Sequence, residues 1–358
     1  MLKSDKIEQN YLETLKSCFS KIPDGEIKLE RVKKQTTVDA VLLFQGNNIE
    51  KEVIVELTSL GTPKRIRNAI NQLLIILREN PQSYGIVVAP YISTRSAEMC
   101  KEANIGYVDL SGNFWIAFNS IFLSQENMPN KYKVETGLTN LYAPKTERVL
   151  RVLLTYPYKI WKTKNLAEEA DISMGMITHI RRKLEEEEWV KHHEVGFSLS
   201  NPQELLINWV NHYDIQKHEQ YDFYTLEPLT EAETRVLEIC DKKNIISALT
   251  CFSAANYLAP MVKSQKSTIF INQDVLEVAR EAGLKSVSSG ANVNLINPYD
   301  PGVFWNRAKV QGLNLVSPVQ IYLDLMQIRG RGEEAASFLF AEVIQKQWEH
   351  QKNNMIPG

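Results

Sequence analysis

Cysteine is scarce in this sequence and shows none of the spacings that mark a structural role. None of the cysteines forms a CxxC pair, and none has a histidine at zinc-finger spacing. The 358 residues contain only four of them, at Cys18, Cys100, Cys240 and Cys251. Structural zinc sites need paired ligands at short spacing, so we expect none here. Scattered single thiols are typical of proteins that work in a reducing compartment.

Long apolar runs are also absent from the sequence. No segment approaches the roughly 18 consecutive apolar residues that a membrane-spanning helix requires. Residues 1–22 instead place Leu12, Leu15 and Phe19 on one face at helical spacing. This segment lacks the apolar centre of a signal peptide, so we predict an amphipathic helix in a cytoplasmic protein without membrane contact.

Charge of one sign is not in excess either. The chain has 41 Lys and Arg against 43 Asp and Glu, and its formal net charge is −2. An overall basic field therefore cannot attract nucleic acid, and any such contact must come from a local arrangement. The apolar fraction of 44% is that of a folded globular protein, and the length predicts two or three domains.

The first 125 residues predict an α/β sandwich, because strands come first and then alternate with helices. Apolar, β-branched runs predict strands at residues 26–33, 38–45 and 51–58. A helix follows at 63–79, with Pro63 in its first turn. Next come the apolar strand "YGIVVAPYI", a helix with Ser93 as its N-cap, and strands on both sides of a turn at 111–113. Residues 126–142 are polar and predict a linker.

Two carboxylates lie on neighbouring predicted strands. Asp39 stands near the start of "TVDAVLLF", and Glu56 stands near the end of "VIVELT". This order of elements resembles the PD-(D/E)xK restriction-endonuclease-like fold. The resemblance implies that the two carboxylates hold Mg²⁺ beside a scissile phosphate, and that a lysine two residues after the glutamate positions the attacking water. Thr58 stands in the place of that lysine.

The threonine makes the catalytic prediction conditional, since it cannot supply positive charge. Lys64 or Arg65, in the following helix, would have to reach back toward the site, and Glu13 of the first helix could add a third carboxylate. If the domain is a nuclease, its catalytic residues are Asp39, Glu56 and Lys64, and the first two are its Mg²⁺ ligands. Otherwise the domain is a degenerate scaffold, with no catalytic residue and no cofactor.

Residues 143–200 predict three helices and then a hairpin, which is the order of a winged helix-turn-helix. The third helix, in "SMGMITHIRRKLEEEEWV", carries small hydrogen-bonding residues and then cations on the side opposite its apolar residues. A recognition helix offers that mixture to base edges and phosphates, and the hairpin would contact the DNA backbone. The predicted DNA-binding residues are Ser173, Thr178, His179, Arg181, Arg182 and Lys191. A winged helix used only for protein contacts is the alternative.

Residues 201–358 predict a second α/β domain. "SALTCFSAANYLA" begins as a strand and turns into a helix, "STIFINQ" is a strand, and "SPVQIYLDLMQI" and "GEEAASFLFAEVIQKQW" are closing helices. Glu333 and Glu334 are expected in the first turn of the last helix, where the helix dipole favours acidic side chains. The domain has no Asp-x-Asp pair for two metals, so we do not expect it to transfer nucleotides.

Three segments together resemble a known family. They are "GIVVAPYISTRSAEMCKEANIGYVDLSGNFWIAF", the predicted winged helix, and the stretch that runs from "SALTCFSAANYLA" to "RGRGEEAASFLF". Over nearly its whole length the chain is similar to the AbiEi-related transcriptional regulators, the antitoxins of type IV toxin–antitoxin systems. The resemblance implies an autoregulating repressor and a cognate nucleotidyltransferase-type toxin. A two-fold operator would make a homodimer the expected assembly.

These observations predict a non-enzymatic α/β multidomain regulator. A restriction-endonuclease-like sandwich occupies residues 1–125, a winged helix-turn-helix at 143–200 reads double-stranded operator DNA, and an α/β domain occupies 201–358. Two alternatives stay open. One is a Mg²⁺-dependent DNA nuclease that the winged helix targets, and the other is a protein-interaction module of a defence locus.

Overall fold

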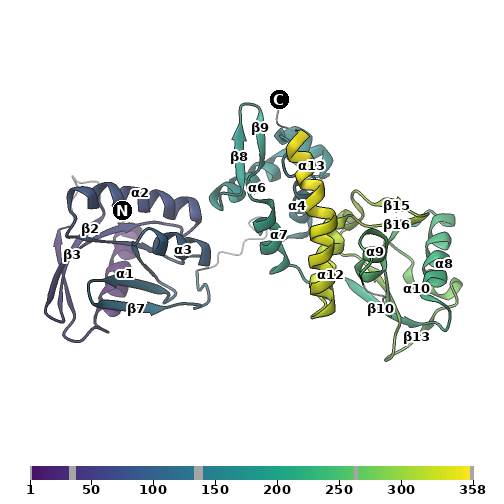
Figure 1. Ribbon diagram of the computed structural model, residues 1–358, viewed down its shortest axis with the longest axis horizontal. Coiled ribbons are helices and arrows are strands. Elements are labelled where there is room, and N and C mark those ends of the chain that lie inside the picture. Colours follow the sequence, from purple (N-terminus) through teal and green to yellow (C-terminus); the bar gives the residue numbers. More distant parts are fainter. Residues whose placement is uncertain (1, 32–37, 133–139, 262–264, 355–358) are drawn as a thin grey trace. The chain divides into compact units, whose positions relative to one another are not determined.

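The computed structural model describes residues 2–31, 38–132, 140–261 and 265–354 (Figure 1). The chain divides into two compact units. The first contains residues 1–135 together with 184–188, and the second contains residues 136–183 together with 189–358. Among the helices of the described residues, none is long and apolar enough to cross a membrane.

The described residues of the first unit form a seven-stranded sheet whose strands follow the order of the chain. The strands are β1 Glu26–Arg31, β2 Ala40–Gly46, β3 Ile49–Leu57, β4 Tyr84–Ala89, β5 Gly106–Asp109, β6 Phe114–Phe118 and β7 Ile121–Gln125. The central strands β3, β4 and β5 are parallel, and the outer pairs on both sides are antiparallel. The strands predicted for this region are confirmed among the described residues, with ends that differ by a few residues. Residues 32 and 33 of the first predicted strand lie outside the described ranges.

Helices cover both faces of this sheet (Figure 1). Helix α1, Leu2–Phe19, packs on the face that carries Val53 and Val55. Helices α2, Pro63–Glu79, and α3, Thr94–Glu102, pack on the face that carries Ile54. Successive residues of a strand point to opposite faces, so strand β3 contributes to two separate cores.

The N-terminal ends of two helices follow the sequence prediction. Helix α2 begins at Pro63, a position where the missing N–H of proline is harmless. Helix α3 is capped by Ser93, whose Oγ accepts a hydrogen bond from the backbone N–H of Ser96 at 3.3 Å. Capping of this kind satisfies a backbone donor that the helix leaves open.

The turn after β5 is organised by a buried carboxylate. Asp109 has no exposed surface, and its Oδ1 accepts the backbone N–H groups of Gly112 and Asn113, each at 2.9 Å. Its Oδ2 accepts the side-chain amide of Asn113 at 2.8 Å and the backbone N–H of Ile92 at 3.1 Å. The sequence "GYVDLSGN" therefore encodes a turn in which one aspartate satisfies four donors.

In the second unit, residues 140–261 are described without a gap and begin with three helices and a hairpin. The helices are α4 Pro144–Thr155, α5 Thr163–Glu169 and α6 Met174–Glu186. The hairpin strands are β8, Val190–His193, and β9, Gly196–Leu199. Trp161 exchanges backbone hydrogen bonds with Phe197 at 2.8 and 3.1 Å, so the segment between α4 and α5 pairs with β9. These are the elements predicted for residues 143–200.

A seven-stranded mixed sheet follows in the described part of the second unit, in the order β13-β10-β14-β12-β11-β16-β15. Its strands are β10 Glu219–Tyr224, β11 Ser247–Leu249, β12 Ser267–Ile271, β13 Lys285–Ser286, β14 Val293–Asn297, β15 Ala308–Val310 and β16 Leu313–Leu315. The helices around it are α7 Pro202–Val210, α8 Leu229–Lys242, α9 Cys251–Leu258, α10 Val275–Glu281 and α11 Pro318–Met326. The prediction that "SALTCFSAANYLA" turns from strand to helix is confirmed by β11 and α9.

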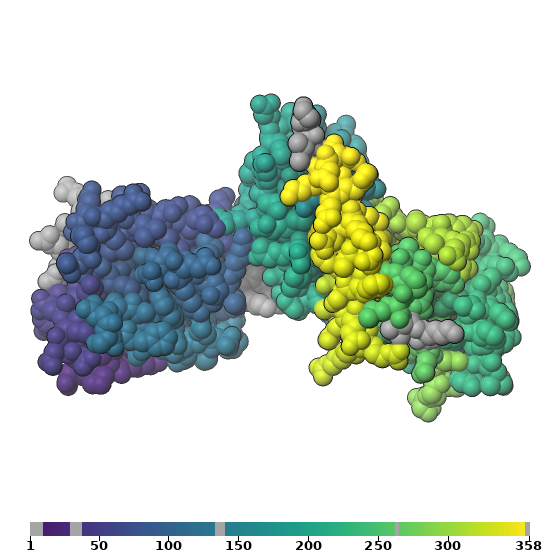
Figure 2. Space-filling view, viewed as in Figure 1, coloured from purple at the N-terminus to yellow at the C-terminus, as the bar shows by residue number. Residues whose placement is uncertain are grey.

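The last described residues form one continuous helical rod. It consists of α12 Arg331–Leu339, the π-helical segment η3 Phe340–Gln345 and α13 Lys346–Asn354. Figure 2 shows it as the yellow ridge on the surface of the second unit. Glu333 and Glu334 lie in its first turn, as predicted. Gly332 packs so closely on α11 that an added Cβ would lie 2.5 Å from the carbonyl oxygen of Leu325.

A buried polar network joins α4 to α11. Arg151 of α4 is fully buried, and its Nε donates to Gln320 Oε1 at 2.8 Å. Gln320 Nε2 donates to Asp324 Oδ1 at 2.8 Å, and the hydroxyl of Tyr213 donates to the same oxygen at 2.6 Å. The hydroxyl of Thr250 donates to the other oxygen of Asp324. The two terminal nitrogens of Arg151 have no hydrogen-bond partner among the described residues. The hydrogen bonds that are made are buried and directional, so they restrict the position of α4 relative to α11.

Helix α13 holds the other end of α4. Trp348 Nε1 donates to the carbonyl of Leu154 at 2.7 Å, and Gln351 Nε2 donates to the carbonyl of Thr155 at 2.9 Å. The last turn of a helix leaves such carbonyls without partners, so these side chains act as a cap in trans. Residues 143–183, 189–200 and 201–358 thus share one compact unit. Two domains can share one compact unit, so their division at residue 200 stays a prediction.

Replacing the central cation of the network is expected to destabilise the second unit. Arg151→Met leaves the buried carboxylate of Glu147, 3.7 Å from the guanidinium, without its counter-charge. The free energy of unfolding should fall by about 3–5 kcal/mol, which urea titration followed by circular dichroism measures. Lys164→Met is the matched control, because Lys164 is an exposed lysine that pairs with Glu168 on α5. Similar losses in both variants would show that the network does not stabilise α4.

Candidate nucleic-acid interface and carboxylate pair

Helix α6 separates buried from exposed residues along its length. Ile177, Ile180 and Leu184 are buried, at the positions that the sequence predicts. The opposite face carries the exposed residues of the first three turns and of the preceding cap, Ser173, Met174, Gly175, Thr178 and Arg182. Met174, Thr178 and Arg182 recur at intervals of four residues, and Gly175 lies on the same side of the helix. Together with Ser173, which precedes the first turn, these residues form one exposed surface that we call the stripe. Small residues at its start would let a DNA backbone or base edge approach the helix closely.

The two predicted hydroxyl residues lie in this stripe. The Oγ of Ser173 accepts a hydrogen bond from the backbone N–H of Met176 at 3.4 Å. The hydroxyl of Thr178 donates to the carbonyl of Met174 at 3.0 Å. Each hydroxyl is exposed and keeps capacity for a further hydrogen bond, because a hydroxyl both donates and accepts.

The two adjacent arginines have different surroundings. Arg182 is exposed, and one of its terminal nitrogens lies 3.3 Å from Nδ1 of His179. Arg181 is half-buried, and its guanidinium carbon lies 5.9 Å from the centroid of the Phe197 ring. This cation–π contact ties α6 to strand β9. Sequence reasoning did not single out Phe197, whose signal is an aromatic residue at an inward position of the hairpin.

His179 is less suited to bind phosphate than the sequence suggests. Burial lowers the pKa of its imidazole, and the neighbouring charges of Arg182 and Lys183 lower it further. A neutral imidazole is the favoured form near neutral pH, so it contributes hydrogen bonding and not a positive charge.

The hairpin presents basic side chains on its outer strand. Lys191 and His192 of β8 are exposed. Nε2 of His193 lies 2.9 Å from the hydroxyl oxygen of Ser198 on β9, so this histidine is engaged within the hairpin. The part of the chain that the structure describes contains no group of three or more His, Cys, Asp or Glu side chains that could hold a metal ion.

In the first unit, Asp39 and Glu56 lie side by side at the end of β3. Asp39 Oδ2 accepts the backbone N–H of Leu57 at 2.7 Å. Glu56 Oε2 is buried and has no hydrogen-bond partner among the described residues. Burial raises the pKa of Glu56 to about 7, and the negative charge of Asp39 raises it too. The two carboxylates are therefore neighbours, as the sequence predicts.

Thr58, at the position where the nuclease family has its lysine, has a structural role. The hydroxyl of Thr58 donates to the carbonyl of Leu60 at 2.9 Å and so forms part of a turn. Lys64 lies in the first turn of α2 and is half-buried. Within the described ranges, no ion pair joins it to either carboxylate, and no cation opposes the rise in the pKa of Glu56.

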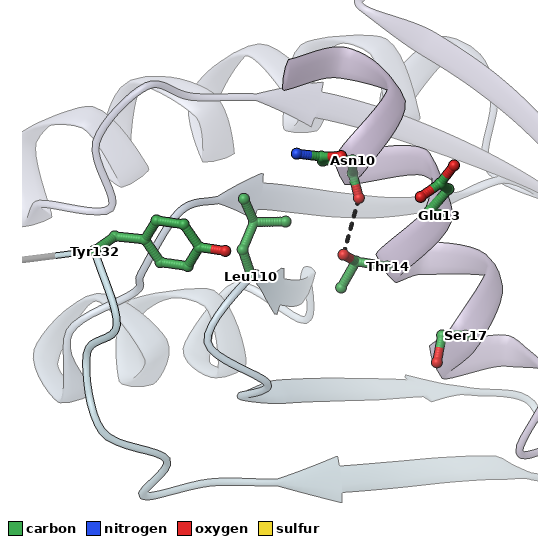
Figure 3. Close-up of a pocket in the computed structure, with 6 residues that line it drawn as sticks. All are labelled: Asn10, Glu13, Thr14, Ser17, Leu110 and Tyr132. Carbon is green, nitrogen blue, oxygen red and sulfur yellow. Dashed lines mark hydrogen bonds between the residues drawn. The ribbon is translucent and has the colours of Figure 1, made fainter. Parts of the chain in front are cut away.

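Glu13 does not complete this carboxylate pair. It lies on α1, which covers the face of Val53 and Val55, whereas Glu56 has the strand position that shares a face with Ile54. Glu13 instead lines a separate, open pocket of about 330 Å³ (Figure 3). The other residues that line this pocket are Asn10, Thr14, Ser17, Leu110 and Tyr132. The expectation that Glu13 adds a third carboxylate is wrong, because the sheet lies between them.

The raised pKa of Glu56 predicts a pH-dependent stability. Its pKa is about 7 in the folded chain against an ordinary value of 4.5, so the folded state prefers the protonated form. The stabilisation that this preference gives is complete below pH 4.5 and is lost as the pH rises to about 7. Glu56→Gln should therefore raise the free energy of unfolding by about 1–3 kcal/mol at pH 8 and by less at pH 5.

Urea unfolding of both proteins at the two pH values measures this difference. Glu98→Gln, at an exposed carboxylate of the same unit, is the control and should change little. A carboxyl ¹³C titration of Glu56 with a midpoint near 4.5 would contradict the prediction.

Comparison with known proteins identifies one region of the chain. Residues 198–345 match the model of a family described as "Transcriptional regulator, AbiEi antitoxin, Type IV TA system". No curated protein and no solved structure matches the chain. The resemblance expected over nearly the whole length is thus shown for less than half of it, from the end of β9 to the end of η3. In this region the chain is similar to the AbiEi antitoxins, which are transcriptional regulators of type IV toxin–antitoxin systems.

Proposed function

We propose that this protein is a transcriptional regulator that binds duplex DNA through a winged helix-turn-helix at residues 143–200. The observation that carries the proposal is the exposed stripe on α6, which starts with small residues and ends at Arg182. Helix α6 would enter the major groove, and the hairpin β8–β9 would lie along the phosphate backbone. The match of residues 198–345 to a family of transcriptional regulators supports this role.

The side chains have separate parts in this proposal. Arg182 is the first candidate for a base or phosphate contact, with Ser173 and Thr178 beside it on the stripe and Lys191 on the hairpin. Arg181 orients the hairpin through its contact with Phe197. A homodimer on a two-fold operator and a cognate nucleotidyltransferase-type toxin are the proposed partners. The restriction-endonuclease-like domain at residues 1–125 serves as a scaffold.

The first experiment uses an end-labelled DNA fragment from upstream of the gene. Protein is added with and without Mg²⁺, half of each sample is treated with DNase, and all samples are run on one gel. A protected window together with intact DNA in the untreated lanes is the result expected for a regulator. If the protein neither protects nor cleaves the DNA at low salt, the result would favour the protein-interaction module.

Arg182→Ala tests the role of the stripe. We expect the variant to bind the protected fragment more weakly by about 1–3 kcal/mol. A base contact would relax specificity, whereas a phosphate contact would reduce the salt slope of binding by about one. Fluorescence anisotropy over a range of salt concentrations measures both. Lys346→Ala removes an exposed cation of α13 as the control, and an equal loss there would count against α6.

A Mg²⁺-dependent DNA nuclease is the second candidate, because Glu56 Oε2 has no protein partner among the described residues and lies beside Asp39. These two carboxylates fit a hard cation whose other ligands are water. Bound Mg²⁺ would hold the phosphate and lower the pKa of a coordinated water. Lys64 would then have to supply the positive charge that Thr58 cannot.

Strand breaks that require Mg²⁺ would support this second candidate. In that case Glu56→Ala is expected to reduce cleavage of the labelled fragment by at least about a hundredfold, while protection by the winged helix persists. Cleavage that Glu56→Ala leaves unchanged would assign the activity to another site or another protein.

A further inference from the structure

The segment Tyr299–Trp305, which follows strand β14 and includes the short helix η2, Pro301–Phe304, packs against the proposed DNA-binding elements. We refer to it as the clasp. The hydroxyl of Tyr299 donates to Glu147 of α4, and Trp305 Nε1 donates to Oε1 of Glu169 at the end of α5 at 3.0 Å. The clasp thus contacts two different helices of residues 143–200 from within the region matched to the antitoxin family.

Arg148 of α4 connects the clasp to the turn between α5 and α6. Its Nε donates to Asp300 Oδ1 at 2.8 Å, and one terminal nitrogen donates to Asp300 Oδ2 at 3.0 Å. The other terminal nitrogen donates to Asp171 Oδ2 at 2.9 Å and to the carbonyl of Asp171 at 3.3 Å. The side chains of Arg148 and Asp300 are only 16% and 8% exposed. A two-point arginine–carboxylate contact of this kind is directional as well as strong.

Asp171 lies in the turn between α5 and α6, and its side chain is 93% exposed although it pairs with Arg148. It has a φ of 51°, in the left-handed region that residues other than glycine seldom adopt. Helix α6 begins three residues later, at Met174. A carboxylate and a carbonyl of the same residue, both held by one guanidinium, fix the direction in which the chain leaves α5.

The clasp packs closely against the stem of the Arg148 side chain. The backbone N–H of Gly302 donates to Asp300 Oδ1 at 2.7 Å. An added Cβ on Gly302 would lie 2.7 Å from Arg148 Cγ and 2.7 Å from Asp300 Oδ1. Trp305 also packs edge-on against Tyr156, with ring centroids 6.2 Å apart. A side chain at Gly302 would therefore have to shift the stem of Arg148 or the carboxylate of Asp300.

We infer that the clasp positions α6 for DNA through the chain of contacts Asp300–Arg148–Asp171. The inference rests on the proposed function in that α6 reads DNA. It adds Asp300 of the clasp, which lies outside residues 143–200, as a positioning residue that acts through Arg148 and Asp171. The C-terminal region therefore takes part in DNA recognition by setting the direction of the turn before α6.

Two substitutions in the full-length chain test the inference by different means. Asp300→Asn removes the charge of the clasp, and Gly302→Ala keeps every charge but shifts Arg148 or Asp300. Hydrogen exchange of residues 169–177, followed by mass spectrometry, should become about tenfold faster in both variants, while exchange in the first unit is unchanged. Glu277→Gln, which breaks the exposed pair with Lys243 between α8 and α10, is the control.

The consequence for recognition is measured on the duplex protected in the footprint. Gly302→Ala should weaken binding by about tenfold without changing its salt slope, because no phosphate contact is removed. Unchanged exchange in residues 169–177 in both variants would overturn the inference. Faster exchange with unchanged affinity would overturn the positioning of α6. If the wild-type chain binds no DNA, the proposed function fails and the exchange experiment still decides whether the clasp holds the turn.

Discussion

The second unit depends on one buried cation. Arg151 lies inside the protein with Gln320 on one side and the carboxylate of Glu147 on the other. A guanidinium cannot lose its charge at any physiological pH, so it must keep these partners wherever α4 packs. The hydrogen bonds continue through Gln320 to Asp324, Tyr213 and Thr250, which come from distant parts of the chain. Apolar packing alone would let α4 slide or rotate, whereas this network allows one position.

Helix α4 consequently contacts both the predicted winged helix and the C-terminal region. It packs on α5 and on strand β9 of the hairpin. Three of its charged residues, Glu147, Arg148 and Arg151, contact Tyr299, Asp300 and Gln320 of the C-terminal region. The C-terminal rod secures its last carbonyls through Trp348 and Gln351. DNA recognition and the region related to AbiEi antitoxins are therefore mechanically connected in this proposal.

The first unit is organised differently. Its central parallel strands β3, β4 and β5 lie between two separate hydrophobic cores. The carboxyl end of its strand β3 carries Glu56 beside Asp39, and burial together with the charge of Asp39 favours the protonated glutamate. A metal site would reverse that preference, because Mg²⁺ binds the ionised carboxylate. The pKa of Glu56 therefore distinguishes an inactive nuclease site from an active one, because only an active Mg²⁺ site needs Glu56 ionised.

Local sequence determined much of the fold. Apolar alternation gave the strands of the first unit, Pro63 and Ser93 marked helix starts, and three-to-four spacing identified Ile177, Ile180 and Leu184 as the inner face of α6. These predictions succeed because backbone propensity and burial of one face act over a few residues. The pairing of Asp39 with Glu56 also followed from sequence, since a hairpin brings neighbouring strands together.

Tertiary structure alone decided the remaining features. Glu13 and Glu56 lie on opposite faces of the sheet. Helix α1, which carries Glu13, packs on the face of Val53 and Val55, whereas Glu56 points to the face of Ile54. Arg181 and Arg182 differ by one position and look alike in the sequence, yet only Arg181 meets the Phe197 ring. Glu147 and Arg151 interrupt the apolar stripe of α4 and read as surface charges, although they are buried. Besides each other, they contact Trp209, Tyr299 and Gln320, which lie more than 50 residues away. A pattern over a few residues carries no information about groups that only folding brings together.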